Sequence, residues 1–181
     1  MTEGEFAALV ADIRTTYVER ELVPAIKQLS SRTSAPSSSE VKFSNIDGVY
    51  KGIAAVDWLE NGPTLHATVV ASQALKEFEP FEHRHGALRI VVSPFAWDAV
   101  HVAGENGSID PVLFERWFDK WFDLADDRPQ GPGLGEIIHS AILSDGGISL
   151  DMGSATVEAF SELLDALEAS GLQRVHIGKV D

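Results

Sequence analysis

The chain has 181 residues, of which 44% are hydrophobic and 23% are charged, and this composition is ordinary for a single globular domain. It contains no cysteine, which excludes disulfide bonds, thiolate metal ligands and cysteine nucleophiles. The net charge of −14 at pH 7 argues against nucleic acids and anionic membranes as partners, because both are themselves negative.

Negative charge is concentrated in the C-terminal half of the chain. Between Asp98 and Leu172 there are 15 Asp and Glu residues and 3 Lys and Arg residues. Charge complementarity speeds the encounter of two proteins and disfavours wrong partners. We therefore expect a partner with a basic surface.

The N-terminus, MTEGEF, has neither the basic nor the apolar stretch that is typical of a secretion signal. The apolar runs of the chain also fall short of the roughly 18 residues that a membrane-spanning helix requires. We therefore expect a cytoplasmic protein.

The first residues have the pattern of a long helix. Thr2 and Glu5 make a capping-box sequence, and apolar residues then recur at helical spacing as far as Leu29. Pro24 lies inside this pattern and predicts a kink or a division near residue 23, because proline has no backbone N–H to donate.

Composition divides the chain into three parts. The helical segment is followed by a serine-rich stretch, SSRTSAPSSSE, that is typical of a flexible linker. The helix can pack on the following domain, act as a dimerisation arm or serve as a tether. The predicted parts are a helical segment at 1–32, a linker at 33–40 and an α+β domain at 41–181.

The α+β part alternates strand-like runs with two helical patterns. Strands are expected at 49–59, 64–72, 88–93, 97–103, 137–143, 148–152 and 174–180, and helices at 110–127 and between Ser154 and Gly171. Turn signals such as Asn61-Gly62 and Asp145-Gly146 indicate hairpins between consecutive strands. We therefore predict an α+β fold, with an antiparallel sheet built from hairpins, helices on one face and two successive ββα units.

The segment 110–127, DPVLFERWFDKWFDLADD, is both strongly apolar and strongly acidic. Asp110 is suited to cap a helix and Pro111 to occupy its first position. The five aromatic residues fall on one side of this helix, namely Phe114, Trp117, Phe118, Trp121 and Phe122. Because aromatic rings bury large areas, this side is expected to lie in the core, in a ligand groove or in a subunit contact.

The opposite side of the same helix carries an unfavourable arrangement of acids. Glu115, Asp119 and Asp123 follow one another at a spacing of four residues, where like charges repel. Asp126 and Asp127 lie at the C-terminal end, where the helix dipole disfavours anions. A solvated acidic face and a surface that docks on a basic protein both fit this pattern.

The motif Glu82-His83-Arg84-His85 is a close histidine cluster. Two imidazoles at i and i+2 on a strand point to the same side, so His83 and His85 could hold a metal with Glu82 completing the ligand set. The neighbouring Pro80 and Gly86 favour an exposed turn over a metal site as the explanation of this motif. The other histidines, at positions 66, 101, 139 and 176, lie singly in predicted strands, where a histidine is usually half-buried and hydrogen-bonded.

Three functions fit these observations. The first is a non-catalytic, protein-binding protein whose acidic C-terminal half docks on a basic partner. In composition the chain is similar to many bacterial immunity and adaptor proteins, although no motif supports that likeness. The alternatives are a small metal-dependent hydrolase that uses Glu82, His83 and His85, and a homodimeric domain. We expect no cofactor, and neither nucleic acid nor membrane as a partner.

Overall fold

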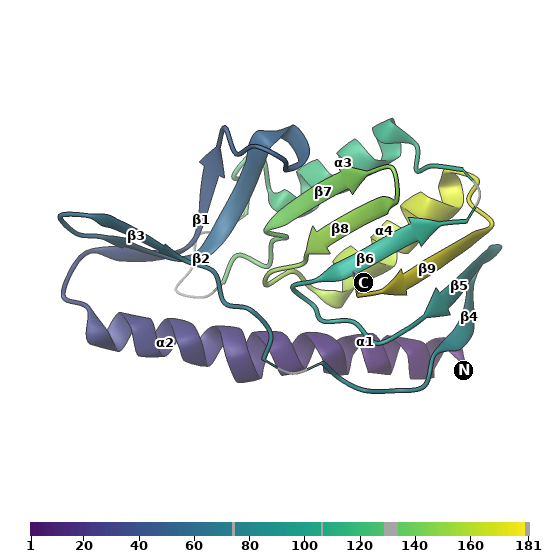
Figure 1. The fold of residues 1–181 in the computed structure, drawn as a ribbon, viewed down its shortest axis with the longest axis horizontal. Coiled ribbons are helices and arrows are strands. Elements are labelled where there is room, and N and C mark those ends of the chain that lie inside the picture. Colours follow the sequence, from purple (N-terminus) through teal and green to yellow (C-terminus); the bar gives the residue numbers. More distant parts are fainter. Residues whose placement is uncertain (74, 106, 129–133, 180–181) are drawn as a thin grey trace.

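A computed structural model describes residues 1–73, 75–105, 107–128 and 134–179 of the chain (Figure 1). These residues form an α+β fold with a six-stranded sheet, a three-stranded sheet and a layer of helices. The predicted fold class and the long N-terminal helix are thereby confirmed.

The N-terminal helix consists of α1 (Glu3–Tyr17), a π-helical turn (Val18–Leu22) and α2 (Val23–Arg32), which run end to end along one edge of the molecule (Figure 1). Thr2 and Glu5 cap its start with the predicted reciprocal hydrogen bonds. The irregularity expected from Pro24 is the π-helical turn that precedes it, in which the Val23 N–H donates to the carbonyl of Val18.

The apolar side of α1 packs on the same chain. Phe6, Val10, Ile13 and Tyr17 are buried in the main core. Arg14 adds a tertiary anchor, because its Nε donates to the carbonyl oxygen of Ala155 at 2.7 Å. The α1 part of the helix is therefore packed on the domain, whereas none of the described residues of α2 is buried.

The smaller sheet has the order β1-β2-β3 and is antiparallel throughout. Its strands are β1 (Ser37–Ser44), β2 (Ile53–Asn61) and β3 (Leu65–Thr68). The predicted linker therefore ends at residue 36, because residues 37–40 belong to a strand. The serine-rich composition indicates weak burial, but it does not prevent backbone pairing with the apolar strand β2.

The larger sheet has the order β4-β5-β9-β6-β8-β7. Its strands are β4 (Phe81–His85), β5 (Leu88–Val92), β6 (Val100–Gly104), β7 (Ser140–Ser144), β8 (Gly147–Asp151) and β9 (Arg174–Gly178). The predicted hairpin of β7 and β8 is present. β5 and β6 do not pair, because β9 lies between them and runs parallel to β5. The two predicted ββα units are therefore not confirmed.

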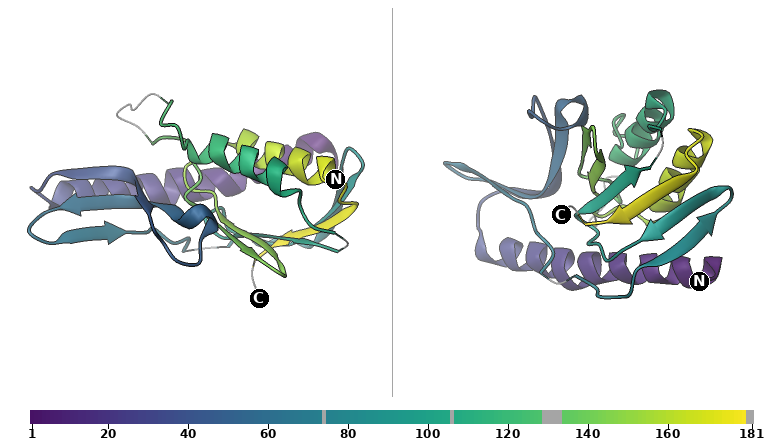
Figure 2. Two further views of the ribbon diagram at one scale, coloured as in Figure 1. Left: turned by 90° about the horizontal axis from the view of Figure 1, so that it is seen from above. Right: turned by 45° about the vertical axis from the view of Figure 1, so that its right-hand side comes forward.

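Helices α3 (Pro111–Phe122) and α4 (Val157–Ala169) lie on the same side of the larger sheet (Figure 2). Asp110 caps α3, as predicted. The aromatic side of α3 is part of the core, where five side chains are 7% exposed or less: Phe114, Trp117, Phe118, Trp121 and Phe122. In the part of the chain that the structure describes, no helix has the length and apolar character needed to cross a membrane.

The helix predicted to reach residue 127 ends at Phe122. Asp123 has a left-handed backbone conformation, with φ of 54°, and closes the helix as its C-cap. Leu124, which a longer helix would place on the apolar side, is consequently 46% exposed.

Candidate functional site

His139 lies at the joint between the two sheets, immediately before β7. Its backbone N–H donates to the carbonyl of Asp151 in β8, and its carbonyl accepts the N–H of Ala55 in β2, both at 2.8 Å. The imidazole is only 1% exposed. A titratable side chain is therefore enclosed where the two sheets meet.

Three carboxylates surround this imidazole. Its Nε2 is 2.9 Å from Oε1 of Glu40, while its Nδ1 is 3.3 Å from Oδ1 of Asp57 and 3.9 Å from Oδ2 of Asp151. These four residues, called the buried network below, come from β1, β2, β8 and the residue before β7. The fold thus gathers them from distant parts of the sequence.

Glu40 has a backbone conformation that is unusual for a strand. Its φ is +50°, a left-handed value that costs a residue with a side chain about 1–2 kcal/mol. The flanking pairs Ser39↔Trp58 and Val41↔Val56 place Glu40 opposite Asp57. Strain of this kind often occurs at functional sites, where the surrounding structure maintains it.

The Glu40 carboxylate is held by several donors. Oε1 accepts the hydroxyl of Ser154 as well as the imidazole of His139, and Oε2 accepts the backbone N–H of Gly135. Ser154 in turn accepts the N–H of Ile137 at 3.2 Å. The orientation of Glu40 is therefore fixed from both sheets.

Asp57 is completely buried, and only one of its two carboxylate oxygens accepts a hydrogen bond. Its Oδ2 accepts the N–H of Val70 at 2.6 Å. Its Oδ1 faces Nδ1 of His139 without forming a hydrogen bond, and both atoms are without a hydrogen-bond partner among the described residues. Unsatisfied buried polar atoms are few in native proteins and often belong to functional sites.

The network sets the charge of its members. Burial disfavours the imidazolium, but the hydrogen bond to Glu40 and the charges of Asp151, Asp57 and Glu40 outweigh burial and raise the pKa of His139 to about 9. Burial likewise raises the pKa of Glu40, but His139, Ser154 and Gly135 more than offset it, so the pKa falls below its usual 4.5. At pH 7 His139 is a cation and Glu40 an anion.

The two aspartates respond differently. Burial raises the pKa of Asp151 to about 6, against the opposing effects of His139 and the Gly153 N–H. Burial also raises the pKa of Asp57, again opposed by His139. Asp151 therefore changes its charge close to neutral pH.

These pKa shifts predict that stability falls as pH rises from 6.5 to 9. In this window the folded protein keeps the proton on His139, while the unfolded chain, with a histidine pKa of 6.5, loses it. The contribution of His139 is complete below pH 6.5 and is lost as pH rises through 9, by at most about 3 kcal/mol. Urea unfolding across this range measures the slope. The variant His139→Gln is the control, and an unchanged slope in that variant would contradict the assignment.

An apolar groove of about 390 Å³ leads to the network. Its walls come from β1, β2, β3 and the loop after β1, and their side chains are Phe43, Ile46, Val49, Ala54, Ala55, Val56, Ala67 and Val69. Ser140 and Asp151 supply the polar part of the lining. Asp151 is 17% exposed, whereas the other members of the network are 5% exposed or less. Asp151 is thus the member that a ligand in the groove can reach.

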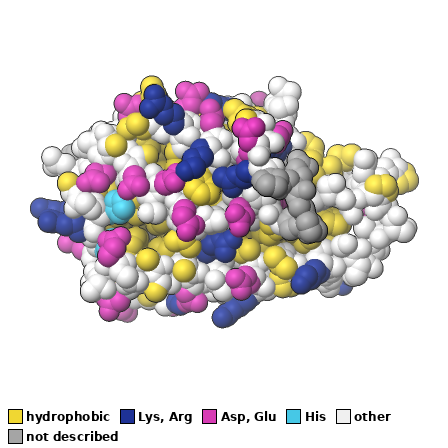
Figure 3. Space-filling model, turned by 180° about the vertical axis from the view of Figure 1, so that it is seen from behind, with side chains coloured by type: hydrophobic (Ala, Val, Ile, Leu, Met, Phe, Trp, Pro, Cys, Tyr) yellow, Lys and Arg dark blue, Asp and Glu magenta, His cyan; other side chains and the backbone are white. Residues whose placement is uncertain are grey.

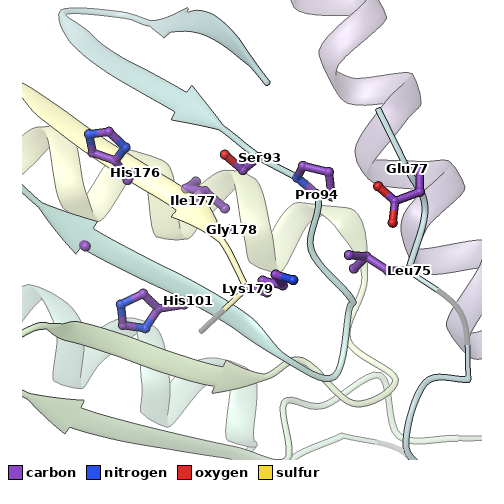
Figure 4. Close-up of a pocket in the computed structure, with 10 residues that line it drawn as sticks. Leu75, Glu77, Ser93, Pro94, His101, His176, Ile177, Gly178 and Lys179 are labelled. Atoms are coloured by element: carbon purple, nitrogen blue, oxygen red, sulfur yellow. The ribbon is translucent and has the colours of Figure 1, made fainter. Parts of the chain in front are cut away.

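A second hollow, of about 510 Å³, lies on the face of the larger sheet that the helices leave open (Figure 4). His101 and His176 line it from the neighbouring strands β6 and β9. Each imidazole has its own partner, because His101 Nδ1 is 3.1 Å from Oγ of Ser149 and His176 Nε2 is 2.8 Å from Oε1 of Glu105. The two histidines therefore share a face without forming one cluster.

The acidic residues of α3 and its C-terminal turn face two lysines. Lys51 Nζ is 2.7 Å from carboxylate oxygens of both Glu115 and Asp119. Lys42 Nζ is 2.6 Å from Oδ1 of Asp126 and 3.6 Å from Oδ2 of Asp123, while the side chain of Asp127 is exposed. Acidic and basic side chains accordingly alternate on this side of the molecule (Figure 3).

The histidine cluster lies in strand β4 and not in an exposed turn. His83 and His85 point to the same side, as the spacing predicts: Nε2 of His83 is 3.2 Å from Glu3, and Nε2 of His85 is 2.7 Å from Asp165. Glu82 alternates to the other face, where it pairs with Arg174 at 2.8 Å. Within the described ranges, no group of three or more His, Asp or Glu residues is arranged to hold a metal.

Sequence reasoning missed the buried network. Asp57 is a charged residue inside the apolar run IAAVDWL, and His139 similarly lies inside the run EIIHSAIL. These positions could have indicated that both side chains are buried. Glu40 carries no such signal, because it follows a serine-rich stretch.

The fold and the network together define an α+β protein with a charged interior below an apolar groove. Comparison with family models, curated proteins and solved structures found no match to this chain.

Proposed function

We propose that the protein is a non-catalytic binding protein that docks on a basic protein partner. The observation that carries the proposal is the position of Asp151 at the polar end of an apolar groove. Behind it, Glu40 and Asp57 already share the single imidazolium of His139. Above the Asp151 pKa of about 6, a positive group from a partner would compensate this excess of negative charge.

The wider charge distribution favours the same kind of partner. Helix α4 contains four acidic residues and no basic one, and the chain as a whole carries a net charge of −14. An excess of this size attracts a basic protein over distances comparable to the Debye length, about 8–10 Å in physiological salt. The acidic side chains of α4, of α3 and of the turn after α3 form an acidic surface that would then speed the encounter. The groove would provide the close contact.

The geometry favours binding over acid–base catalysis. A general base must come within hydrogen-bond reach of the proton that it removes. His139 is buried and its Nε2 faces Glu40 at 2.9 Å. The nearby Ser154 hydroxyl donates to Glu40 and is 1% exposed, so it is poorly placed to act as a nucleophile.

The acidic surface is tested by neutralising Asp119, Asp123 and Asp126 together as asparagines. The tagged wild-type protein is expected to retain a basic protein from its native lysate at low salt and to lose much of it at high salt. With the purified partner, the triple variant should associate several-fold more slowly and with a weaker dependence on salt.

A matched control removes the same charge elsewhere, at the exposed residues Glu19, Glu79 and Asp145. If the two triple variants associate equally fast, the position of the acids is irrelevant and only net charge matters. Equal rates for the wild-type protein and both variants at low salt would contradict the proposed electrostatic docking.

A further inference from the structure

We propose that the groove is a socket for a lysine side chain of the partner, with the ammonium group at Asp151 and the aliphatic stem along the apolar walls. This inference rests on the proposed function and specifies the chemistry of its contact. It follows from the apolar lining of the groove, from its charge and from the acceptor atoms of Asp151 and Ser140.

The walls suit a long unbranched stem. They consist of aliphatic side chains from β2, β3 and the neighbouring loops, and of one aromatic ring, that of Phe43 in β1. Val69 and Ile46 are 60% and 39% exposed, respectively, so apolar surface is left in contact with water. Lysine buries a four-carbon stem while keeping a compact charge at its end. A side chain of this form would cover the walls and place its charge beyond them.

The polar end of the groove has the opposite charge. Among the described residues that line the groove there is one carboxylate, that of Asp151, and no basic side chain. His139, the nearest cation, lies 3.9 Å behind Asp151 and also faces Glu40 and Asp57. Negative charge at the end of the groove therefore remains to be matched from outside the chain.

The free acceptors favour an ammonium group over a guanidinium group. Oδ1 of Asp151 already accepts the Gly153 N–H at 2.9 Å, and Oδ2 faces Nδ1 of His139 at 3.9 Å, beyond hydrogen-bond distance. Ser140 pairs with Asp151 across β7 and β8 and lines the same end of the groove, so its hydroxyl offers a second acceptor. An ammonium group donates in several directions, whereas an arginine fork is best matched by two free oxygens of one carboxylate.

The test uses the full-length protein and three small probes, the N-acetyl, N-methylamide derivatives of lysine, arginine and norleucine. Norleucine has an apolar chain of similar length without the charge. Methyl NMR signals of Ala54, Val56, Ala67 and Val69 report occupation of the groove. The lysine probe should shift these signals saturably at millimolar concentrations, and the other two probes should bind at least about tenfold more weakly.

Two substitutions locate the contact. Asp151→Asn, which keeps an acceptor for the Gly153 N–H, should weaken the lysine probe about tenfold. Asp145→Asn, in the turn at the opposite end of the β7–β8 hairpin, should not. Ala67→Leu should block the groove, whereas His66→Leu, the neighbouring residue of β3, should leave it open. The methyl spectra of each variant in the absence of probe show whether the fold is retained.

Equal binding of the lysine and norleucine probes would overturn the inference, as would unchanged lysine binding in Asp151→Asn. Tighter binding of the arginine probe would also overturn the choice of lysine. These results leave the proposed function to a separate measurement, because salt-dependent association with a basic protein would persist if a group other than lysine filled the groove. Loss of that association with intact lysine binding would reject the docking proposal alone.

Discussion

Replacing His139 by alanine is expected to lower the free energy of unfolding at pH 7 by about 3–5 kcal/mol. The substitution removes the imidazolium and leaves Glu40, Asp57 and Asp151 facing one another in the interior. A buried carboxylate without a cationic partner is repelled or has to bind a proton. The loss should therefore be larger at pH 7, where Asp151 is ionised in the wild-type protein, than at pH 5, where Asp151 is protonated.

Urea unfolding of the wild-type protein and His139→Ala at pH 5 and pH 7 measures this effect. His176→Ala is the control, because His176 lies on an exposed part of β9 and its loss should change stability by no more than about 0.5 kcal/mol. A loss below about 1 kcal/mol at pH 7 for His139→Ala would show that the carboxylates do not depend on the imidazole.

Replacing Gly153 by alanine is expected to destabilise the protein by at least about 3 kcal/mol. Gly153 has a φ of +50°, and an added Cβ would lie 2.2 Å from Cδ2 of His139. The methyl group would force the imidazole away from Glu40, in addition to the penalty of about 1–2 kcal/mol for a left-handed residue. Steric strain in a packed interior and a disrupted charge network therefore act together.

Gly171 provides the matched control for this substitution. Its φ is +80°, but an added Cβ would meet no atom within 4 Å. Gly171→Ala should therefore lower the free energy of unfolding only by the penalty for a left-handed residue with a side chain, about 1–2 kcal/mol. Thermal or urea unfolding compares the two variants, and equal losses would mean that the contact of Gly153 with His139 has no energetic role.

Local patterns predicted the elements whose stabilising contacts are close in sequence. The Thr2 and Glu5 cap, the Asp110 cap and the hairpin at residues 145–147 all depend on residues within a few positions of one another. The aromatic side of α3 was also predictable, because five large rings in one helix require burial. Periodicity and turn chemistry are sufficient for such features.

The order of strands could not be predicted in the same way. β9 is the last strand in the chain but lies between β5 and β6. Its residues Val175 and Ile177 are buried whichever strands flank them, so the pattern of apolar residues does not choose the neighbours. The hairpin rule favoured a pairing of β5 with β6, and the packing of the whole sheet overrode it.

The site was hidden for a similar reason. His139 and Glu40 are 99 positions apart, and their contact exists only because the smaller sheet joins the larger one at Ala55. The acids of α3 also meet partners that their own segment does not reveal, Lys42 and Lys51. The repulsion expected from spacing along the helix is therefore offset in part, because the fold brings cations to these acids from outside their own segment.

The π-helical turn between α1 and α2 determines which way the second half of the long helix faces. The buried residues of α1 are spaced by three or four positions as far as Tyr17, and the buried residues of the turn, Val18 and Leu22, lie one position later in this repeat. One additional residue in a helix rotates everything beyond it by about 100°. The N-terminal helix can therefore present one side to α4 and β4 and a different side to β2. The rotation at the π-helical turn fixes the orientation of the smaller sheet. The site at the joint between the sheets thus depends on a register set in a turn of the N-terminal helix.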